Sequence, residues 1–159
     1  MVTAEDILHQ KDRDMVSIPV DVTIIEALQT MSENKIGSVL AIQDDAIVGI
    51  WTERDLLHDT LTPGFDPKTA KVADYMTTEL HSAPHTDTIY GLLDTFLGKR
   101  FRHLLVEKDG EYIGLISIGD VVRACLEDKT KELKDLNAIV SWEYYEDWKW
   151  KHKHKHSHR

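Results

Sequence analysis

The chain has 159 residues and a formal net charge of −9, with 42% hydrophobic and 30% charged residues. This composition is typical of a folded globular protein, and the length suits one compact unit or two small subdomains that share a core. The acidic balance excludes a protein that binds a nucleic-acid backbone through a broad basic face. No apolar run in the sequence approaches the roughly 20 residues that cross a bilayer, so we expect no membrane contact.

The N-terminus and the cysteine content indicate the compartment. Residues 1–6 lack the basic region and the apolar core of a secretion signal. Cys125 is the single cysteine, so it cannot form an internal disulfide, which is typical of proteins in a reducing compartment. We therefore expect a cytoplasmic protein.

The first half of the chain predicts a small module. Thr23 and Glu26 form a capping-box pattern at the start of an apolar stripe, which predicts a helix there. Residues 44–46 lie between two short apolar runs and predict a tight hairpin turn. The expected elements are a helical turn at 5–11, a strand at 15–20, a helix at 23–35, strands at 38–42 and 47–52, and a helix that begins at Thr52 and has Leu56, Leu57 and Leu61 as its apolar residues.

The second half predicts the same order of elements after a linker. Two prolines and a glycine within residues 62–67 predict the linker, and Asp109-Gly110 predicts a hairpin turn. The expected elements are a helical turn at 73–76, a strand at 80–84, a helix at 88–99, strands at 102–107 and 112–117, and a helix at 120–126. Each half therefore has the order strand, helix, strand, strand, helix after its opening turn.

A seven-residue pattern closes the last strand of each half. Gly49 to Asp55 and Gly114 to Asp120 both have glycine, two apolar residues, a hydroxyl residue, two variable residues and aspartate. The two glycines lie 65 positions apart (114 − 49), and matching residues before them keep that spacing. A period this long is not that of a solenoid repeat. It indicates two copies of one module, which we expect to pack together because one copy alone would bury too little apolar surface.

The repeat stops after Leu126. Charged residues with apolar positions at helical spacing predict a further amphipathic helix over residues 129–140. Residues 142–150 hold three of the four tryptophans, and we expect this aromatic segment to dock on the module, on a second copy or on another protein. Lysine and histidine alternate over residues 151–159, a low-complexity tail that we expect to be disordered without a partner.

With this element order and two matched signature segments, residues 5–127 resemble the CBS domain, named for cystathionine β-synthase. Two such domains in tandem form a Bateman module. The resemblance implies an α+β fold of two pseudo-symmetric βαββα copies packed through their sheets, followed here by a C-terminal helix and the tail. The expected limits are 1–62 for the first copy, 63–72 for the linker, 73–127 for the second copy, 128–150 for the C-terminal amphipathic and aromatic helix, and 151–159 for the tail.

The resemblance also implies a site. Many CBS pairs bind adenosine-containing ligands such as AMP, ADP, ATP or S-adenosylmethionine in clefts between the sheets, and they commonly form homodimers through their helices. The resemblance implies that the two aspartates of the signature hold the ribose, that the two hydroxyl residues face the phosphates, and that the first two strands of each copy surround the base. The expected ligand-binding residues are Ser17, Ile18, Ser38, Val39, Thr52, Arg54, Asp55, Ser82, Ala83, Arg100, Arg102, His103, Leu104, Ser117 and Asp120.

The signature residues also have a purely structural interpretation. A hydroxyl residue followed three positions later by an acidic residue is a capping box at a helix start. A helix N-terminus equally offers free amides and a partial positive charge to a phosphate, and a carboxylate accepts hydrogen bonds from ribose hydroxyls. The two roles are compatible, so both stay open.

The two copies differ in charge and in one aromatic residue. Arg100, Arg102 and His103 surround the second strand of the second copy. They favour phosphate binding in the second-copy cleft, and the alternative is a solvated helix end. Trp51 occupies the position that Ile116 has in the second copy. The indole either fills the core or a dimer face, or it narrows the first cleft.

The sequence indicates a binding module and not an enzyme. The sequence has no recognisable motif for a serine or cysteine nucleophile activated by a histidine, and it has neither a glycine-rich phosphate loop nor a Cys-x-x-Cys pair. The tail supplies weaker metal-ligand candidates, because neutral imidazole binds Zn²⁺, Ni²⁺ and Cu²⁺. These candidates are His152, His154, His156 and His158.

Three functions follow from these patterns. The leading hypothesis is a stand-alone regulatory module, an energy sensor that binds an adenine nucleotide with or without Mg²⁺. It would act as a homodimer and pass a change of shape to an unidentified regulated protein. The alternative is a ligand-independent dimerisation or scaffolding module that acts through the aromatic C-terminal segment. A third hypothesis is metal handling through the histidine tail.

Overall fold

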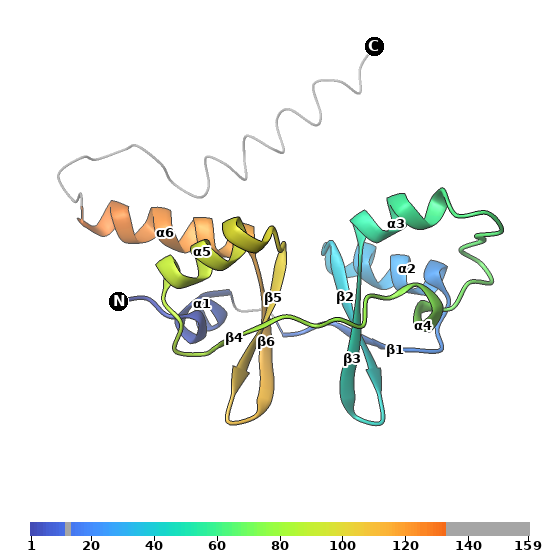
Figure 1. Ribbon diagram of the computed structural model, residues 1–159, viewed down its shortest axis with the longest axis horizontal. Helices are drawn as coiled ribbons and strands as arrows, with labels where there is room; N and C mark the ends of the chain where they lie inside the picture. The colour runs from blue at the N-terminus through green and yellow to red at the C-terminus, as the bar shows by residue number, and fades with distance from the viewer. Residues whose placement is uncertain (12–13, 133–159) are drawn as a thin grey trace, which may run out of the picture.

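The computed structural model describes residues 1–11 and 14–132 (Figure 1). Its helices are α1 (Ala4–Lys11), α2 (Ile24–Asn34), α3 (Glu53–Thr60), α4 (Val72–Tyr75), α5 (Ile89–Lys99) and α6 (Ile118–Glu132). Its strands are β1 (Ser17–Pro19), β2 (Ser38–Gln43), β3 (Ala46–Thr52), β4 (Ser82–Pro84), β5 (His103–Lys108) and β6 (Glu111–Ser117). The order β1-α2-β2-β3-α3 recurs as β4-α5-β5-β6-α6, which confirms the predicted two-copy α+β fold.

Each copy contains a three-stranded sheet with the same topology. The first strand is parallel to the second, and the second is antiparallel to the third, in the orders β1-β2-β3 and β4-β5-β6. The register shifts at the same place in both copies, between Ala41 and Ile42 and between Val106 and Glu107. In Figure 1 the two sheets lie next to each other at the centre, and the larger helices of each copy lie on the outer sides. The copies therefore pack through their sheets, as predicted.

Short-range interactions set the ends of the helices. The Glu26 N–H donates to Thr23 Oγ1 at 3.3 Å, and the Thr23 N–H donates to Glu26 Oε2 at 2.8 Å, so the predicted capping box of α2 is confirmed. The residues that follow α2 and α5 adopt the left-handed conformation, Lys35 at φ 54° and Arg100 at φ 56°. This conformation ends each helix and directs the chain toward β2 and β5.

The core consists of two clusters, one behind each sheet. The first-copy cluster contains Ile18, Ile24, Ala27, Met31, Val39, Ala41, Trp51 and Val72. The second-copy cluster contains Ala4, Ile7, Ala83, Ile89, Leu92, Phe96, Leu104, Val106, Ile116, Val121 and Ala124.

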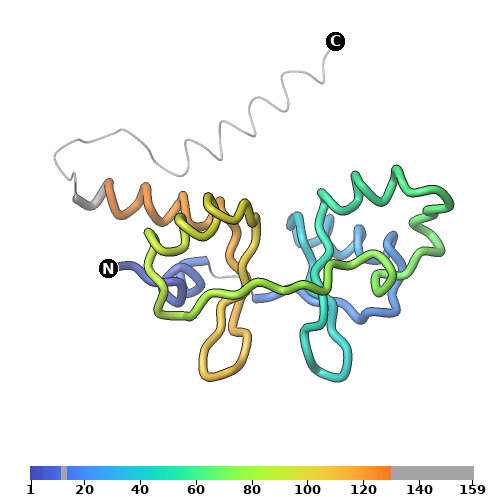
Figure 2. The backbone as a smooth tube through the Cα atoms, viewed as in Figure 1, coloured from blue at the N-terminus to red at the C-terminus, as the bar shows by residue number. Residues whose placement is uncertain are grey.

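The two opening helices are exchanged between the copies. Val72 of α4 is buried in the first-copy cluster, whereas Ala4 and Ile7 of α1 are buried in the second-copy cluster. Figure 2 shows the exchange: the blue start of the chain lies beside the yellow and orange second copy, and the green α4 lies beside the first copy. The domain limits expected from the sequence are therefore limits along the chain and not the limits of the packed units.

The two signature glycines make this exchange possible. A Cβ on Gly114 would lie 2.5 Å from Leu8 Cδ2, and a Cβ on Gly49 would lie 2.4 Å from Met76 Sδ. Each glycine therefore leaves room on its strand for a side chain of the opening helix or of the residue that follows it. The glycine of the signature is explained by packing.

Gly114→Val is expected to lower the free energy of unfolding by about 1 to 3 kcal/mol, because Leu8 must leave a packed position. Urea unfolding followed by circular dichroism measures the change. Gly98→Val is the matched control: a Cβ on Gly98 meets nothing within 4 Å, and valine has a higher helix propensity than glycine, so no loss is expected. Equal unfolding midpoints for the wild type and Gly114→Val would contradict the packing of Leu8 on this strand.

The three leucines predicted as the apolar residues of this helix have different environments. Leu57 and Leu61 do not face the core, because their side chains are 70% and 83% exposed. Leu56 is half-buried and packs against the first-copy cluster. Leu57 and Leu61 are four residues apart and lie on another side of the helix, which the structure leaves uncovered.

The C-terminal expectations fall largely outside the described residues. The last described helix, α6, runs without a break from Ile118 to Glu132, so residues 129–132 continue this helix instead of starting a new one. The remainder of the predicted C-terminal helix, the aromatic segment and the histidine tail lie beyond the part that the structure describes. Among the described residues, no helix combines the length and the apolar character needed to cross a membrane.

Candidate functional site

The first signature segment forms a corner where β3 ends and α3 begins. Side chains alternate between the two faces of a strand, so Trp51 enters the first-copy cluster while Thr52 points the other way and caps α3. The Asp55 N–H donates to Thr52 Oγ1 at 3.3 Å. Asp55 Oδ2 accepts hydrogen bonds from the Thr52 N–H at 2.9 Å and from Thr52 Oγ1 at 3.1 Å. The structural interpretation of the signature as a capping box is therefore confirmed at this corner.

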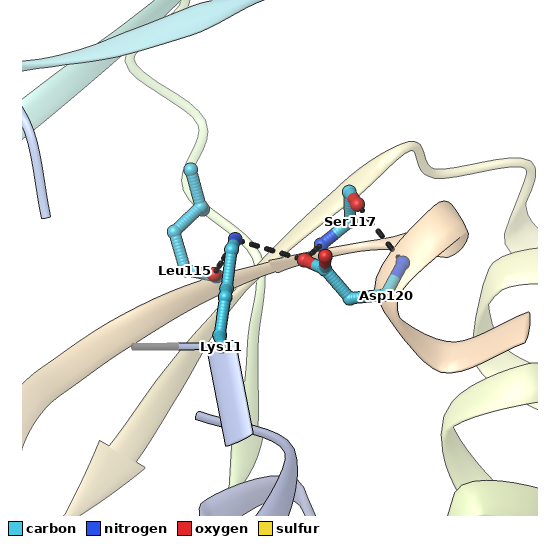
Figure 3. Close-up of polar contacts among 4 residues, drawn as sticks. All are labelled: Lys11, Leu115, Ser117 and Asp120. Atoms are coloured by element: carbon cyan, nitrogen blue, oxygen red, sulfur yellow. Dashed lines mark hydrogen bonds and ion pairs between the residues drawn. The ribbon is translucent and has the colours of Figure 1, made fainter. Parts of the chain in front are cut away.

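The second corner, between β6 and α6, has the same cap and one addition (Figure 3). The Asp120 N–H donates to Ser117 Oγ at 3.2 Å, and the Ser117 N–H donates to Asp120 Oδ2 at 2.8 Å. The addition is Lys11, the last residue of α1. Its Nζ lies 2.8 Å from Asp120 Oδ2 and donates to the Leu115 carbonyl oxygen at 3.0 Å. The second corner thus contains a cation bound to its aspartate.

The ion pair changes the acidity of Asp120. Burial alone raises the pKa of this carboxyl, but hydrogen bonds from Lys11 and from the Ser117 amide, together with the Lys11 charge, hold the pKa below its ordinary value. A carboxyl whose pKa is lowered by folding stabilises the protein at a pH above its unfolded-state pKa. This contribution is lost as the pH falls through the lowered pKa of the folded state, so the pair is intact at neutral pH.

A cleft of about 520 Å³ opens between the sheets beside the first corner. It joins predicted site residues from both copies, namely Thr52, Arg54 and Asp55 from the first and Arg100, Arg102 and His103 from the second. The basic residues of the second copy therefore share a cleft with Asp55 of the first copy. The preference for a second-copy cleft depended on these basic residues, which line the same cleft as Asp55.

His103 lies at the junction of the two corners. It pairs with Ser117 across β5 and β6, and it lines the cleft. Burial lowers the pKa of His103, and the nearby Lys11 charge lowers it further, against the opposite effect of Asp120. The imidazole is therefore neutral at neutral pH, with one nitrogen that donates a hydrogen bond and one that accepts.

The other predicted contacts of the first two strands lie outside this cleft. Four are buried in the helix-side clusters, namely Ile18, Val39, Ala83 and Leu104. Ser38 is buried and pairs with Thr52 across β2 and β3. Ser17 and Ser82 are exposed, and Ser82 lines a separate pocket of about 310 Å³. The structure thus brings together the corner and the basic residues, and it does not bring the first-strand serines to them.

Sequence reasoning missed an aromatic pair and a carboxylate in the cleft. His81 and Phe101 stack with ring centroids 3.8 Å apart and planes inclined by 19°, and both line the cleft. A signal for this pair was present, because His81 directly precedes β4, Phe101 lies two residues before β5, and the two strands are parallel neighbours. Glu79 also lines the cleft, and nothing in the repeat marked it.

Side chains that bind metals do not cluster in the part of the chain that the structure describes. Within residues 1–11 and 14–132, no group of three or more histidine, cysteine, aspartate or glutamate side chains is placed to hold a metal ion. Cys125 is half-buried and packs against the second-copy cluster. The four tail histidines lie beyond the described part of the chain, so metal binding by them stays a prediction.

Known proteins share this sequence pattern. The family model described as the CBS domain matches residues 4–60 and 72–127. The mitochondrial CBS domain-containing protein CBSX3 of Arabidopsis thaliana is 32% identical over 152 residues, which cover 89% of this chain and 73% of that protein.

Solved structures share the fold. A CBS-domain-containing protein from Agrobacterium tumefaciens is 38% identical with a TM-score of 0.73, and the match covers 78% of this chain and 99% of that one. The structure of CBSX2 in complex with AMP is 26% identical with a TM-score of 0.66, and the match covers 81% of this chain and 99% of that one. From the two family-model matches and the fold, the chain belongs to the CBS domain family and carries two CBS domains in tandem.

Proposed function

We propose that this chain is a regulatory module that binds an adenosine nucleotide, with AMP as the first candidate, in the cleft beside the first corner. The observation that carries the proposal is the composition of the cleft, which joins the Thr52 and Asp55 corner of one copy to the arginines of the other. CBSX2, a structural relative that is 26% identical, has been solved in complex with AMP and supports this choice of ligand.

Asp55 is the ribose-binding group in this proposal. Both hydrogen bonds that its carboxylate accepts from described residues come from Thr52 and reach the same oxygen, Oδ2. No lysine or arginine within the described ranges forms an ion pair with Asp55. The carboxylate keeps acceptor capacity for two ribose hydroxyls, the same match that acidic residues make in dinucleotide-binding folds. The capping box holds the carboxylate at the start of α3, so it is oriented before the ligand arrives.

The rest of the cleft suits a phosphate and a base. Arg54, Arg100 and Arg102 are exposed at the cleft and supply fixed positive charge, and guanidinium groups bind phosphate oxygens in pairs. The stacked His81 and Phe101 rings offer a flat surface to adenine. A volume of about 520 Å³ lies within the range of roughly 300 to 1,000 Å³ that is usual for small-molecule sites.

Regulation requires a second surface, and α3 and α6 provide one. Leu57 on α3 and Leu61, which directly follows α3, are 70% and 83% exposed, and Val122 on α6 is 45% exposed. Apolar residues exposed on each of these helices favour protein contact, and we propose a homodimer through these helices. A nucleotide bound between the sheets would then move α3 relative to α6 and pass that change to a regulated protein. This requires that the nucleotide bind one arrangement of the sheets more tightly than the other.

Isothermal titration calorimetry with AMP tests the proposed function. We expect saturable binding at millimolar concentration or below, and weaker binding of adenosine because the arginines lose the phosphate. ADP, ATP and S-adenosylmethionine, titrated with and without Mg²⁺, identify the preferred ligand. Light scattering on the same sample gives the molar mass and tests the homodimer. If none of the four ligands gives a binding heat or a thermal shift at millimolar concentration, the proposal of nucleotide binding is overturned.

A further inference from the structure

We propose that Lys11 is a built-in occupant of the second corner, so that each chain takes a single adenosine nucleotide, at the first corner. This inference rests on the proposed function and specifies the stoichiometry of the same site. Its basis is the position of the Lys11 ammonium, 2.8 Å from Asp120 Oδ2 and 3.0 Å from the Leu115 carbonyl oxygen (Figure 3).

The ammonium group competes directly with a ribose. A ribose hydroxyl and an ammonium are both donors, and Asp120 Oδ2 already accepts from Lys11 and from the Ser117 N–H. A charged donor forms the stronger hydrogen bond with a carboxylate. The Asp120 side chain is only 10% exposed and that of Lys11 is 27% exposed, so water screens this pair less than it would a surface pair. A nucleotide that binds this oxygen would have to displace Lys11 first.

The first corner lacks this occupant. Leu8 packs over Gly114, and Met76 packs over Gly49, so these two residues hold equivalent positions in the two copies. Three residues further along the chain are Lys11 in one case and Glu79 in the other. Glu79 lines the cleft, and an ionised carboxylate cannot donate a hydrogen bond to Asp55.

The partner of the backbone carbonyl beside each corner also differs between the two copies. In the first copy, the Ile50 carbonyl oxygen accepts from the Thr77 N–H at 2.8 Å, and the Ile50 N–H donates back to the Thr77 carbonyl oxygen at 2.9 Å. In the second copy, the equivalent carbonyl of Leu115 accepts from Lys11 Nζ. A side chain that satisfies a backbone carbonyl and a carboxylate together is part of the fold at this corner.

Packing of α1 fixes the position of Lys11. Ala4 and Ile7 are buried in the second-copy cluster. Glu5 forms a second ion pair, in which Lys108 Nζ lies 2.6 Å from Glu5 Oε1. Because α1 is anchored at several points, its packing places Lys11 next to Asp120.

Calorimetric stoichiometry with AMP tests the inference. The wild type is expected to bind about one AMP per chain, and Lys11→Met about two, because methionine keeps an apolar stem and removes the ammonium. The second site of Lys11→Met should disappear in the double variant Lys11→Met/Asp120→Asn, which assigns that site to the second corner. Lys108→Met is the matched control: it removes the other ion pair of α1 but leaves the corner intact, so it should keep about one site.

The outcomes separate this inference from the proposed function. Wild type that binds two AMP molecules overturns the inference, whatever the stability of the variants. A folded Lys11→Met that still binds one AMP also overturns it, while nucleotide binding itself stands. If neither the wild type nor Lys11→Met binds AMP, the proposed function fails and the inference fails with it.

Discussion

Trp51→Ala is expected to lower the free energy of unfolding by about 3 to 5 kcal/mol, the usual cost of truncating a large buried aromatic side chain. Trp51 is fully buried in the first-copy cluster, and its indole N–H donates to Asp59 Oδ2 at 2.8 Å. Alanine leaves a cavity behind β3. It also removes a hydrogen bond that opposes the rise in the pKa of Asp59 caused by burial. Since domains are typically stable by only about 5 to 15 kcal/mol, urea unfolding will resolve the loss easily.

Trp51→Phe separates the cavity from the hydrogen bond. Phenylalanine fills most of the volume and lacks the indole N–H, so the expected loss is about 1 to 2 kcal/mol. The same variant tests the hypothesis that the indole narrows the first cleft. Trp51 is not among the residues that line the cleft, so Trp51→Phe should bind AMP as the wild type does. Tighter AMP binding by this variant, or an unchanged unfolding midpoint for Trp51→Ala, would contradict the position of the side chain.

Most of the fold is predictable because short-range patterns encode it. A capping box needs only two residues three positions apart, so the helix starts at Thr23 and at Thr52 can be recognised without any tertiary information. The hairpin turn is equally local: Asp44 and Asp45 have φ of 52° and 60°, a conformation that aspartate tolerates better than most residues. The repeat adds support, because each element recognised in one copy predicts the same element in the other.

Short-range patterns do not show which part of the molecule packs against the apolar face of a helix. The apolar residues of α1 indicate that the helix is covered, but Ile7 packs on the second copy and not on the one that follows it in the chain. In and directly after α3 the sequence has three leucines, of which only Leu56 packs against the core. The choice between a buried face and an exposed one depends on how neighbouring elements pack, and periodicity alone does not supply it.

In the candidate site, too, short-range patterns predict some features and tertiary packing determines the others. The cap at each corner follows from the signature, whereas the association of Asp55 with Arg100 and Arg102 arises only when the two sheets pack. The pairing of Lys11 with Asp120 joins residues that are far apart in sequence and follows from the exchange of the opening helices. The signature therefore predicts two equivalent corners, and tertiary packing makes them different.

Asp55→Asn is expected to weaken AMP binding by about 100-fold. The reason is that two ribose hydroxyls lose hydrogen bonds to a charged acceptor, each of which contributes about 1.5 to 3 kcal/mol, and the remaining amide oxygen recovers part of this energy. Asparagine retains an oxygen that accepts from the Thr52 N–H, so the cap of α3 should survive. Calorimetry measures the affinity, and thermal unfolding verifies that the variant is folded.

Asp120→Asn is the matched control, because it makes the same change at the equivalent corner. If Lys11 occupies that corner, Asp120→Asn breaks the ion pair and lowers thermal stability while AMP affinity at the first corner stays close to that of the wild type. The reverse result, in which Asp120→Asn abolishes AMP binding and Asp55→Asn does not, would place the ribose at the second corner and refute the assignment. Equal weakening by both variants would indicate two occupied clefts, since each carboxylate would then hold its own ribose. Because the two aspartates share a signature, a cap and a position in the repeat, any difference between the variants must come from what packing adds to each corner.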